Sequence, residues 1–336
     1  MKLLKMTFML AMSLAFMACA NETSVFFAEE DVPQTYTVSL TPSGEVSVSL
    51  EPLTKGTPTN DIYGINVYYD KEKDGVTNDI YGYGLFDNLE DMKVSLLSGY
   101  KYRFVCSMVK NGKSTLFWGA AFGQTQSGYA YPFHTGIYAA TVLGNKFVLG
   151  SGSLIGLASG SAHLKGQTSA TTANMYTYAP GVERYYGETG DYTPTASGTV
   201  SIALKKVIFG AKFVIEGIQG GTLTATCGSL WEKTTTVDDT GTETIYSYPS
   251  LYDCWKNEST LPMTVSLSFQ GDGGGNILQT TQSVTFKRNT LTVVTIRIPS
   301  GTFSITEEPL DTDNYIDLGL NGDGVIDTPV TPTPES

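Results

Sequence analysis

The chain has 336 residues, of which 41% are hydrophobic and only 16% are charged, and its formal net charge is −12. The apolar content is sufficient for two domains of ordinary size, each with its own core. The acidic balance leaves no basic patch of the kind that nucleic-acid binding needs, so we expect no nucleic-acid partner. Abundant Gly, Ser, Thr and Tyr indicate strands and turns rather than long surface helices.

The chain begins with a predicted signal peptide over residues 1–18, with two early lysines, an apolar run and small residues at its end. The apolar run is shorter than the roughly 20 residues of a membrane span. Cys19 follows Phe16-Met17-Ala18, which resembles a lipobox, whose cysteine is acylated. The alternative is ordinary cleavage, because Ala18-Cys19-Ala20 matches an A-x-A site. We expect an exported lipoprotein of the cell envelope, with palmitate-type chains on Cys19 and a tether over residues 19–33.

Alternation of apolar and polar residues begins at residue 34, where Tyr36, Val38 and Leu40 share one face of an expected strand. A hairpin turn is expected at Asn111-Gly112. Residues 34–196 therefore predict an N-terminal β-sandwich that ends in an irregular crossover. Its further strands are expected at 65–69, 83–86, 93–97, 100–109 and 115–118.

A second β-sandwich is expected over residues 197–306, because short alternating runs are separated there by frequent turns. The glycine-rich run 271–275 predicts a hairpin loop between two of its strands. Residues 307–336 are acidic and lack Lys and Arg, which is typical of a solvated tail. The predicted fold class is all-β, with two tandem β-sandwich domains. The expected strands are 200–204, 207–215, 223–227, 263–269, 277–286 and 291–298.

Two stretches resemble a known family. Residues 198–213, GTVSIALKKVIFGAKF, follow RYYGE at 184–188 and resemble the start of the second domain in fimbrillin-like lipoproteins of Bacteroidetes. The run 81–86, YGYGLF, followed by SGYKYRF at 98–104, is similar to their first domain. The resemblance covers most of residues 34–300. It implies two transthyretin-like β-sandwich domains in a fimbrial subunit, or in a pilus anchor or accessory protein. The location that it implies is the outer membrane, at the cell surface or in a fimbrium.

In polymerising members of that family, a trypsin-like protease cuts after an arginine and removes the first strand, and the groove then accepts a strand of the next subunit. Here no arginine precedes Arg103, and the loop after the first strands offers only Lys55. Either the cut is at Lys55, or the chain is an uncleaved anchor or accessory member, or it does not polymerise. The alternating Ile316, Leu318 and Leu320 form a candidate donor strand, and pairing within their own chain is the alternative.

The sequence predicts no enzyme, cofactor or metal site. H-E-x-x-H and G-x-S-x-G motifs do not occur. Asn321, Asp323 and Asp327 match part of a calcium loop, but the carboxylates at its first and last positions are missing. Asp87 with Glu90, and Glu183 with Glu188, are candidate carboxylate pairs, but we expect all four acids to be solvated loop residues.

Three cysteines remain after Cys19. Cys106 and Cys227 alternate with apolar residues and are expected to face a core, whereas Cys254 lies in a segment that resembles a loop. An oxidising compartment permits a Cys227–Cys254 disulfide, and inert thiols are the alternative.

Tyrosine is frequent, with 20 residues. Tyrosine faces can stack on sugars, so an exposed row of Tyr129, Tyr131 and Tyr186 would indicate a carbohydrate-binding lipoprotein of a glycan-uptake system. Tyrosine is also an ordinary strand residue. The expected partners are thus a membrane, other fimbrial subunits and a host or glycan ligand.

Overall fold

Strands dominate the structure, a computed structural model that describes residues 33–45, 58–71, 76–121, 123–136, 139–150, 152–171, 174–227, 231–236, 241, 243–298 and 302–310. In these ranges the predicted all-β class is confirmed, with two short α-helices and one 3₁₀ turn beside the strands. The expected signal peptide and most of the expected tether lie outside the described residues. So does most of the expected acidic tail, although the last strand continues from Thr302 to Pro309.

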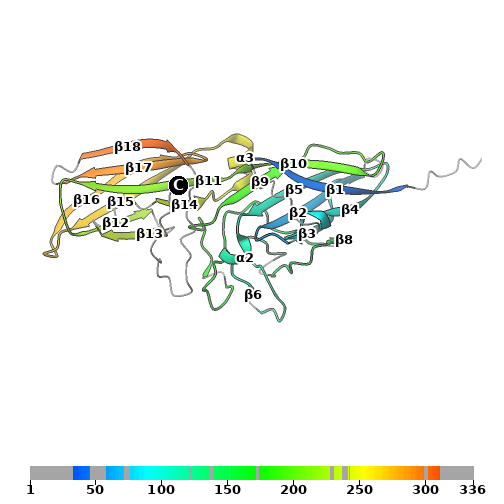
Figure 1. Cartoon of the computed structure of the whole chain (residues 1–336), viewed down its shortest axis with the longest axis horizontal. Coiled ribbons are helices and arrows are strands. Elements are labelled where there is room, and N and C mark those ends of the chain that lie inside the picture. Colours follow the sequence, from blue (N-terminus) through cyan, green and yellow to red (C-terminus); the bar gives the residue numbers. More distant parts are fainter. Residues whose placement is uncertain are drawn as a thin grey trace, which may run out of the picture. The chain divides into compact units, whose positions relative to one another are not determined.

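The elements of the first half surround one large sheet (Figure 1). They are β1 (Thr35–Gly44), β2 (Ile62–Lys71), β3 (Val76–Phe86), η2 (Leu89–Asp91), β4 (Lys93–Leu97), β5 (Lys101–Val109), α2 (Gly112–Thr115), β6 (Gly119–Ala120), β7 (Ser127–Gly128), β8 (Phe147–Leu149) and β9 (Arg184–Glu188).

The second half supplies the remaining elements. They are β10 (Gly198–Lys206), β11 (Ile208–Glu216), β12 (Thr222–Cys227), β13 (Trp231–Thr236), β14 (Glu243–Ser247), α3 (Leu251–Asn257), β15 (Leu261–Gln270), β16 (Asn276–Phe286), β17 (Thr290–Arg297) and β18 (Thr302–Pro309).

The first sheet has eight strands in the order β4-β1-β10-β9-β5-β2-β3-β8. Residues from both ends of this order share one buried cluster: Leu96 of β4 and Leu40 of β1 lie with Phe86 of β3 and Phe104 of β5. Because one cluster is enclosed by strands from opposite ends of the sheet, the sheet curls over on itself. A single sheet therefore supplies both layers of the N-terminal sandwich.

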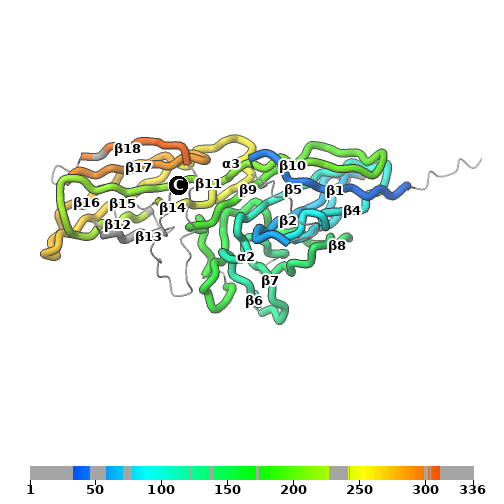
Figure 2. Tube along the Cα trace, in the orientation of Figure 1, coloured from blue at the N-terminus to red at the C-terminus, as the bar shows by residue number. Residues whose placement is uncertain are grey.

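The chain changes sheets at Val207. Strand β10 runs parallel to β1 in the first sheet, whereas β11 begins at Ile208 and joins a different sheet (Figure 2). The change thus falls ten residues beyond the predicted domain boundary at residue 197. Periodicity could not locate it, because both strands alternate and the only interruption is the single buried Val207.

Two four-stranded sheets, β14-β11-β17-β18 and β13-β12-β15-β16, form the second sandwich. Their facing side chains include Phe213 and Ile296 of the first sheet and Leu267 and Phe286 of the second, all buried in one cluster. The predicted hairpin between the strands expected at 263–269 and 277–286 is confirmed as β15 and β16.

Two local expectations are wrong. Asn111 does take a left-handed turn conformation, but the chain then forms the helical turn α2 because the Ser114 and Thr115 amides donate to the Asn111 carbonyl. Cys254 lies in helix α3 rather than in a loop. Ser250 caps this helix by accepting from the Asp253 amide at 3.3 Å.

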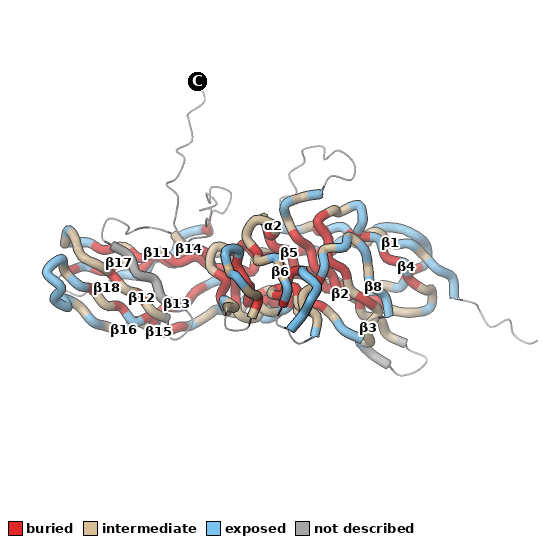
Figure 3. The backbone as a smooth tube through the Cα atoms, turned by 90° about the horizontal axis from the view of Figure 1, so that it is seen from below, coloured by how far each residue is buried: buried red, intermediate tan, exposed pale blue. Residues whose placement is uncertain are grey.

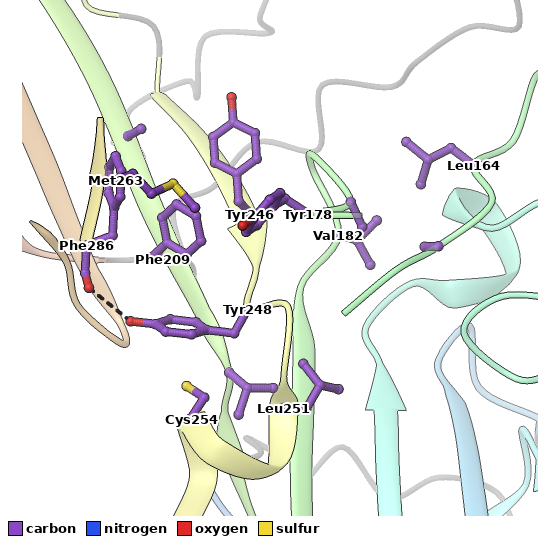
Figure 4. Packing of buried hydrophobic residues seen from close by; sticks show 14 of the residues in the cluster. Leu164, Tyr178, Val182, Phe209, Tyr246, Tyr248, Leu251, Cys254, Met263 and Phe286 are labelled. Atoms are coloured by element: carbon purple, nitrogen blue, oxygen red, sulfur yellow. Dashed lines mark hydrogen bonds between the residues drawn. The ribbon is translucent and has the colours of Figure 1, made fainter. Parts of the chain in front are cut away.

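Buried residues occur in both halves of the described chain (Figure 3), and the largest cluster of buried side chains includes members from both. Phe209 lies at its centre, with its ring 4.8 Å from Phe286 and 5.4 Å from Tyr248 (Figure 4). The Tyr248 hydroxyl donates to the Phe286 carbonyl at 3.2 Å, so its polar end is satisfied within the core. Tyr178, from the crossover before β9, packs edge-on against Phe209.

Candidate functional site

Most of the site residues predicted from sequence lie outside the described residues. This holds for the lipidation candidate Cys19, the cleavage candidate Lys55, the donor-strand candidates Ile316, Leu318 and Leu320, and the weak calcium candidates Asn321, Asp323 and Asp327. Within the described ranges, no group of three or more metal-ligating side chains comes together. No helix there has the length and apolar character to cross a membrane.

The cysteines are buried where they are described. Cys106 is a free thiol in β5, and Cys254 is a free thiol with no disulfide partner among the described side chains. Burial raises the pKa of both thiols to about 12, so they stay protonated and unreactive at neutral pH. Cys227 ends β12, but its side chain lies outside the described set, and the Cys227–Cys254 bridge stays a prediction.

Of the four acids expected to be solvated, Glu90 is exposed and Glu188 is half-buried, whereas Asp87 and Glu183 are buried and paired. The Lys113 ammonium lies 2.8 Å from Asp87, whose other carboxylate oxygen accepts from the Asn145 amide at 2.7 Å. Glu183 lies 3.3 Å from Lys110 and accepts from the Tyr185 hydroxyl. The two ion pairs join positions far apart in the chain, so sequence spacing gave no signal of them.

Strand β1 forms the first candidate site, because it is inserted between two strands of the large sheet. It pairs antiparallel with β4, from Thr35 opposite Leu97 to Ser39 opposite Lys93, and parallel with β10. The predicted apolar face is confirmed at Val38 and Leu40, which are buried, whereas Tyr36 is half-buried. Val38 and Leu40 lie in a cluster with residues of β4, of β10 and of the end of η2: Val94, Leu96, Ile202, Leu204 and Met92.

Glu45, directly after β1, holds the end of the strand in place. Its carboxylate accepts from the Lys206 amide at 2.8 Å and lies 2.9 Å from the Arg288 guanidinium. The Glu45 amide donates to the Leu204 carbonyl at 2.9 Å. The chain then continues into residues 46–57, which contain Lys55 and lie outside the described residues.

The second candidate site is a polar groove of about 880 Å³ on the outer side of β2, β3, β5 and β9. Segments distant in sequence line it, including 155–159 from the crossover and the first turn of α3. We call it the tyrosine groove after three of its side chains. Its lining residues are Asn66, Tyr68, Asp70, Asn78, Arg103, Val105, His134, Ile155, Gly156, Leu157, Ala158, Ser159, Tyr186, Glu188, Asp191 and Tyr252.

Arg103 organises the floor of the tyrosine groove. Its guanidinium stacks 4.4 Å from the centre of the Tyr68 ring and donates to Glu188 at 2.7 Å and to the Asn78 side-chain oxygen at 3.1 Å. The other Glu188 oxygen accepts from the Tyr186 hydroxyl at 2.6 Å. These charge-assisted bonds fix the side chains in one arrangement.

The wall of the groove is tied to its floor through Asn66. The buried Asn66 amide donates to the Ile155 carbonyl at 2.7 Å and accepts from the Ile155 amide at 3.1 Å. Next in the chain, Gly156 lies under the His134 ring, where an added Cβ would come within 2.3 Å of a ring carbon. Only glycine fits this close approach, so residue 156 helps to shape the groove.

His134 and His163 lie on either side of Tyr131, with ring centres 4.1 and 5.3 Å from the tyrosine ring. Burial lowers the pKa of both histidines, and the neighbouring His163 lowers that of His134 further. Both imidazoles are therefore neutral at pH 7.

The aromatic row expected from sequence does not form. Tyr129 and Tyr186 are only 4% and 3% exposed, and Tyr131 is half-buried between the histidines. The side chain missed by the sequence analysis is Tyr252, which is 41% exposed at the groove. Tyr252 lies in the first turn of α3, and Ser250, a good helix cap, is the sequence signal that could have indicated a helix at this position.

Comparison with known proteins gives a mixed result. No family profile matches the sequence, and no curated protein matches it. Among solved structures, a fimbrial assembly protein from Parabacteroides distasonis is 12% identical and has a TM-score of 0.34, with 83% of this chain and 96% of that chain covered. The fimbrial anchor protein Mfa2 from Porphyromonas gingivalis is 12% identical with a TM-score of 0.35, and the match covers 82% of this chain and 98% of that chain.

A third similar structure, from Bacteroides thetaiotaomicron, is described as a candidate polysaccharide-binding protein. It is 11% identical with a TM-score of 0.35, and the match covers 83% of this chain and 99% of that chain.

Proposed function

We propose that this chain is a cell-envelope lipoprotein that acts as a fimbrial structural, anchor or accessory component in adhesion. Its work is the pairing of strands between subunits and requires no catalysis. The observation that carries the proposal is the position of β1 between β4 and β10 in the large sheet.

A strand in this position can be exchanged. Main-chain hydrogen bonds and a short apolar face, centred on Val38 and Leu40, make up most of the contacts of β1 with its neighbours, beside a few polar side-chain contacts such as Ser43 with Ser201. If the chain is cut after β1, the strand can leave and expose two unpaired edges. Such edges accept an extended segment by β-augmentation, in which backbone bonds give affinity and buried side chains give register.

Limited digestion tests the strand-exchange part of the proposal. The mature chain is treated with a lysine-specific protease and followed by N-terminal sequencing and by gels of unboiled samples. We expect early cleavage after Lys55, loss of the β1 fragment and then a ladder of oligomers. The Lys55→Gln variant serves as the control and should stay monomeric under the same treatment. A cleaved chain that loses β1 and remains monomeric would contradict the strand-exchange proposal.

The anchor is tested separately. Cys19→Ser should move the protein from the membrane to the soluble fraction of the cells, because acyl chains bind bilayers by about 0.8 kcal/mol per buried CH₂ group. Metabolic labelling with a palmitate analogue should mark the wild type and leave the variant unlabelled. Unchanged fractionation of Cys19→Ser would exclude the lipid anchor at this residue.

A further inference from the structure

The tyrosine groove is not needed for strand pairing. It lies on the outer side of the sheet, whereas β1 packs its apolar face into the enclosed cluster. Its volume, about 880 Å³, falls in the upper part of the range of small-molecule sites, roughly 300–1,000 Å³. A cavity of this size has room for a ligand longer than one sugar ring.

We propose that the tyrosine groove binds a neutral oligosaccharide. Its walls offer hydrogen-bond acceptors on Asp70 and Asp191, the side-chain amide of Asn78, and an exposed aromatic face on Tyr252. A hydroxyl-rich ring presents both donors and acceptors around its edge and C–H groups on its faces. The mixture of carboxylates, amides and aromatic rings matches both features.

The charges of the groove decide against an anionic ligand. Asp70, Glu188 and Asp191 line it together with a single guanidinium, that of Arg103. Arg103 already donates to Glu188, so two carboxylates remain without a compensating cation in the lining. A phosphate, sulfate or uronic acid would meet this excess negative charge and be repelled.

The floor of the groove is arranged before any ligand arrives. Tyr68, Arg103, Glu188 and Tyr186 are joined by the stacking contact and the hydrogen bonds described above. Asn66 is fixed by its two bonds to Ile155. Binding of a ligand therefore costs little conformational entropy of these side chains, which favours affinity. Tyr252 stands apart, because its exposed ring can stack on a sugar without disturbing the floor.

The test uses the full mature chain on a glycan array. The array carries neutral glucan, mannan, galactan and xylan oligosaccharides, sialylated and uronic-acid glycans, and a lysine-rich peptide. We expect binding to one class of neutral oligosaccharide, and titration calorimetry with that oligosaccharide gives the Kd. Preference for the anionic glycans or for the cationic peptide would overturn the proposal, as would no binding to any neutral glycan at about 1 mM, the weak end of specific recognition.

Two variants locate the binding in the groove. Tyr252→Ala should raise the Kd about tenfold, the loss expected for one aromatic contact, and Asp191→Asn should also weaken binding. The matched controls are Tyr176→Ala, which removes a tyrosine that is 47% exposed and lies outside the groove, and Asp253→Asn, next to Tyr252 but outside the lining. If the control variants raise the Kd as much as Tyr252→Ala and Asp191→Asn do, the sugar binds elsewhere. The same follows if Tyr252→Ala keeps its thermal stability and leaves the Kd unchanged.

These variants leave β1 and Lys55 untouched. A failure of sugar binding would therefore leave the strand-exchange result unaffected, and a monomeric cleaved chain would leave the groove result unaffected.

Discussion

Arg184 is completely buried in β9, although no carboxylate pairs with it among the described residues. One of its nitrogens donates to the Ser107 hydroxyl at 2.9 Å, whereas Nε and Nη1 have no partner in the described structure. Burial lowers the pKa of the guanidinium to about 9, so it still carries its charge at neutral pH. A buried charge without a counterion costs free energy of folding.

Arg184→Met should therefore stabilise the protein, because it keeps the length of the side chain and removes the charge. We expect the free energy of unfolding in urea to rise by about 1–3 kcal/mol. Arg103→Met is the comparison, since Arg103 is paired with Glu188 and should lose stability. A decrease in the free energy of unfolding of more than about 1 kcal/mol is a clear mutational effect. Such a decrease for Arg184→Met would show that the charge is needed in the fold.

The buried histidines make stability depend on pH. An imidazole has a pKa near 6.5 in the unfolded chain, and burial lowers it for His134 and His163 in the fold. The unfolded chain then binds more protons below pH 6.5. The stabilising effect is complete above this pH and is lost as the pH falls, by up to about 1.4 kcal/mol per pH unit for each histidine.

His163→Phe tests this dependence, because phenylalanine keeps the edge-on contact with Tyr131 and cannot be protonated. The variant should lose less thermal stability than the wild type between pH 7.5 and pH 5, measured by circular dichroism. Carboxylates titrate in both proteins, so the difference between them isolates the histidine. Identical acid slopes would contradict the assignment.

Among the elements, the short edge strand β8 depends on two glycines of its neighbour. It pairs with Gly82, Tyr83 and Gly84 of β3. A Cβ added to Gly82 would lie 2.5 Å from the Val148 carbonyl oxygen, closer than real Cβ contacts allow. The exposed side chains of Val148 and Leu149 gain little from burial, so β8 is held by the close backbone pairing and by the Phe147 ring, whose centre lies 4.9 Å from that of Phe86.

Gly82→Val should therefore detach β8 while the rest of the sheet persists. We expect faster hydrogen exchange at residues 147–149 and only a small change in the melting temperature. Gly190→Val is the control, because a Cβ there meets no atom within 4 Å. Unchanged protection of β8 in Gly82→Val would mean that the strand tolerates the added side chain and is held by other contacts.

Period-two alternation located most strands, including β1, β5, β15 and β16, because a strand with one buried face reveals itself residue by residue. It could not reveal pairing. The parallel alignment of Val38 with Gly198 joins positions 160 residues apart, and nothing local specifies it. Short helical turns were missed for a related reason, since α2 depends on bonds to the Asn111 carbonyl rather than on a repeating apolar pattern.

At the scale of the molecule, the tyrosine groove lay beyond sequence reasoning altogether. Its lining comes from β2, β5, β9, the crossover and α3, which only the fold brings together. Tyrosine content drew attention to Tyr129 and Tyr131, but burial decides which rings reach solvent, and those two are used for packing. Composition indicated a β-rich chain, whereas tertiary packing decided which side chains line the groove.

The described residues from Thr35 onward belong to one compact unit, and their largest apolar cluster contains residues of both sandwiches. Ile62 of the first sheet and Leu267 of the second sandwich belong to this cluster, with Tyr178 and Val182 of the crossover. Unfolding of either half would thus expose apolar surface of the other, which couples their stabilities.

We therefore expect one unfolding transition in urea, with the same midpoint by far-UV circular dichroism and by fluorescence of the three tryptophans, of which Trp118 precedes the sheet change at Val207 and Trp231 and Trp255 follow it. Phe209→Ala should lower both midpoints together and reduce the free energy of unfolding by about 3–5 kcal/mol. The reason is that its ring packs against those of Tyr178, Tyr246, Tyr248 and Phe286. Two separated transitions, with Phe209→Ala shifting only one, would mean that the sandwiches fold independently. In that case the shared cluster would act as an interface between domains, and release of β1 could loosen the first sandwich without affecting the second.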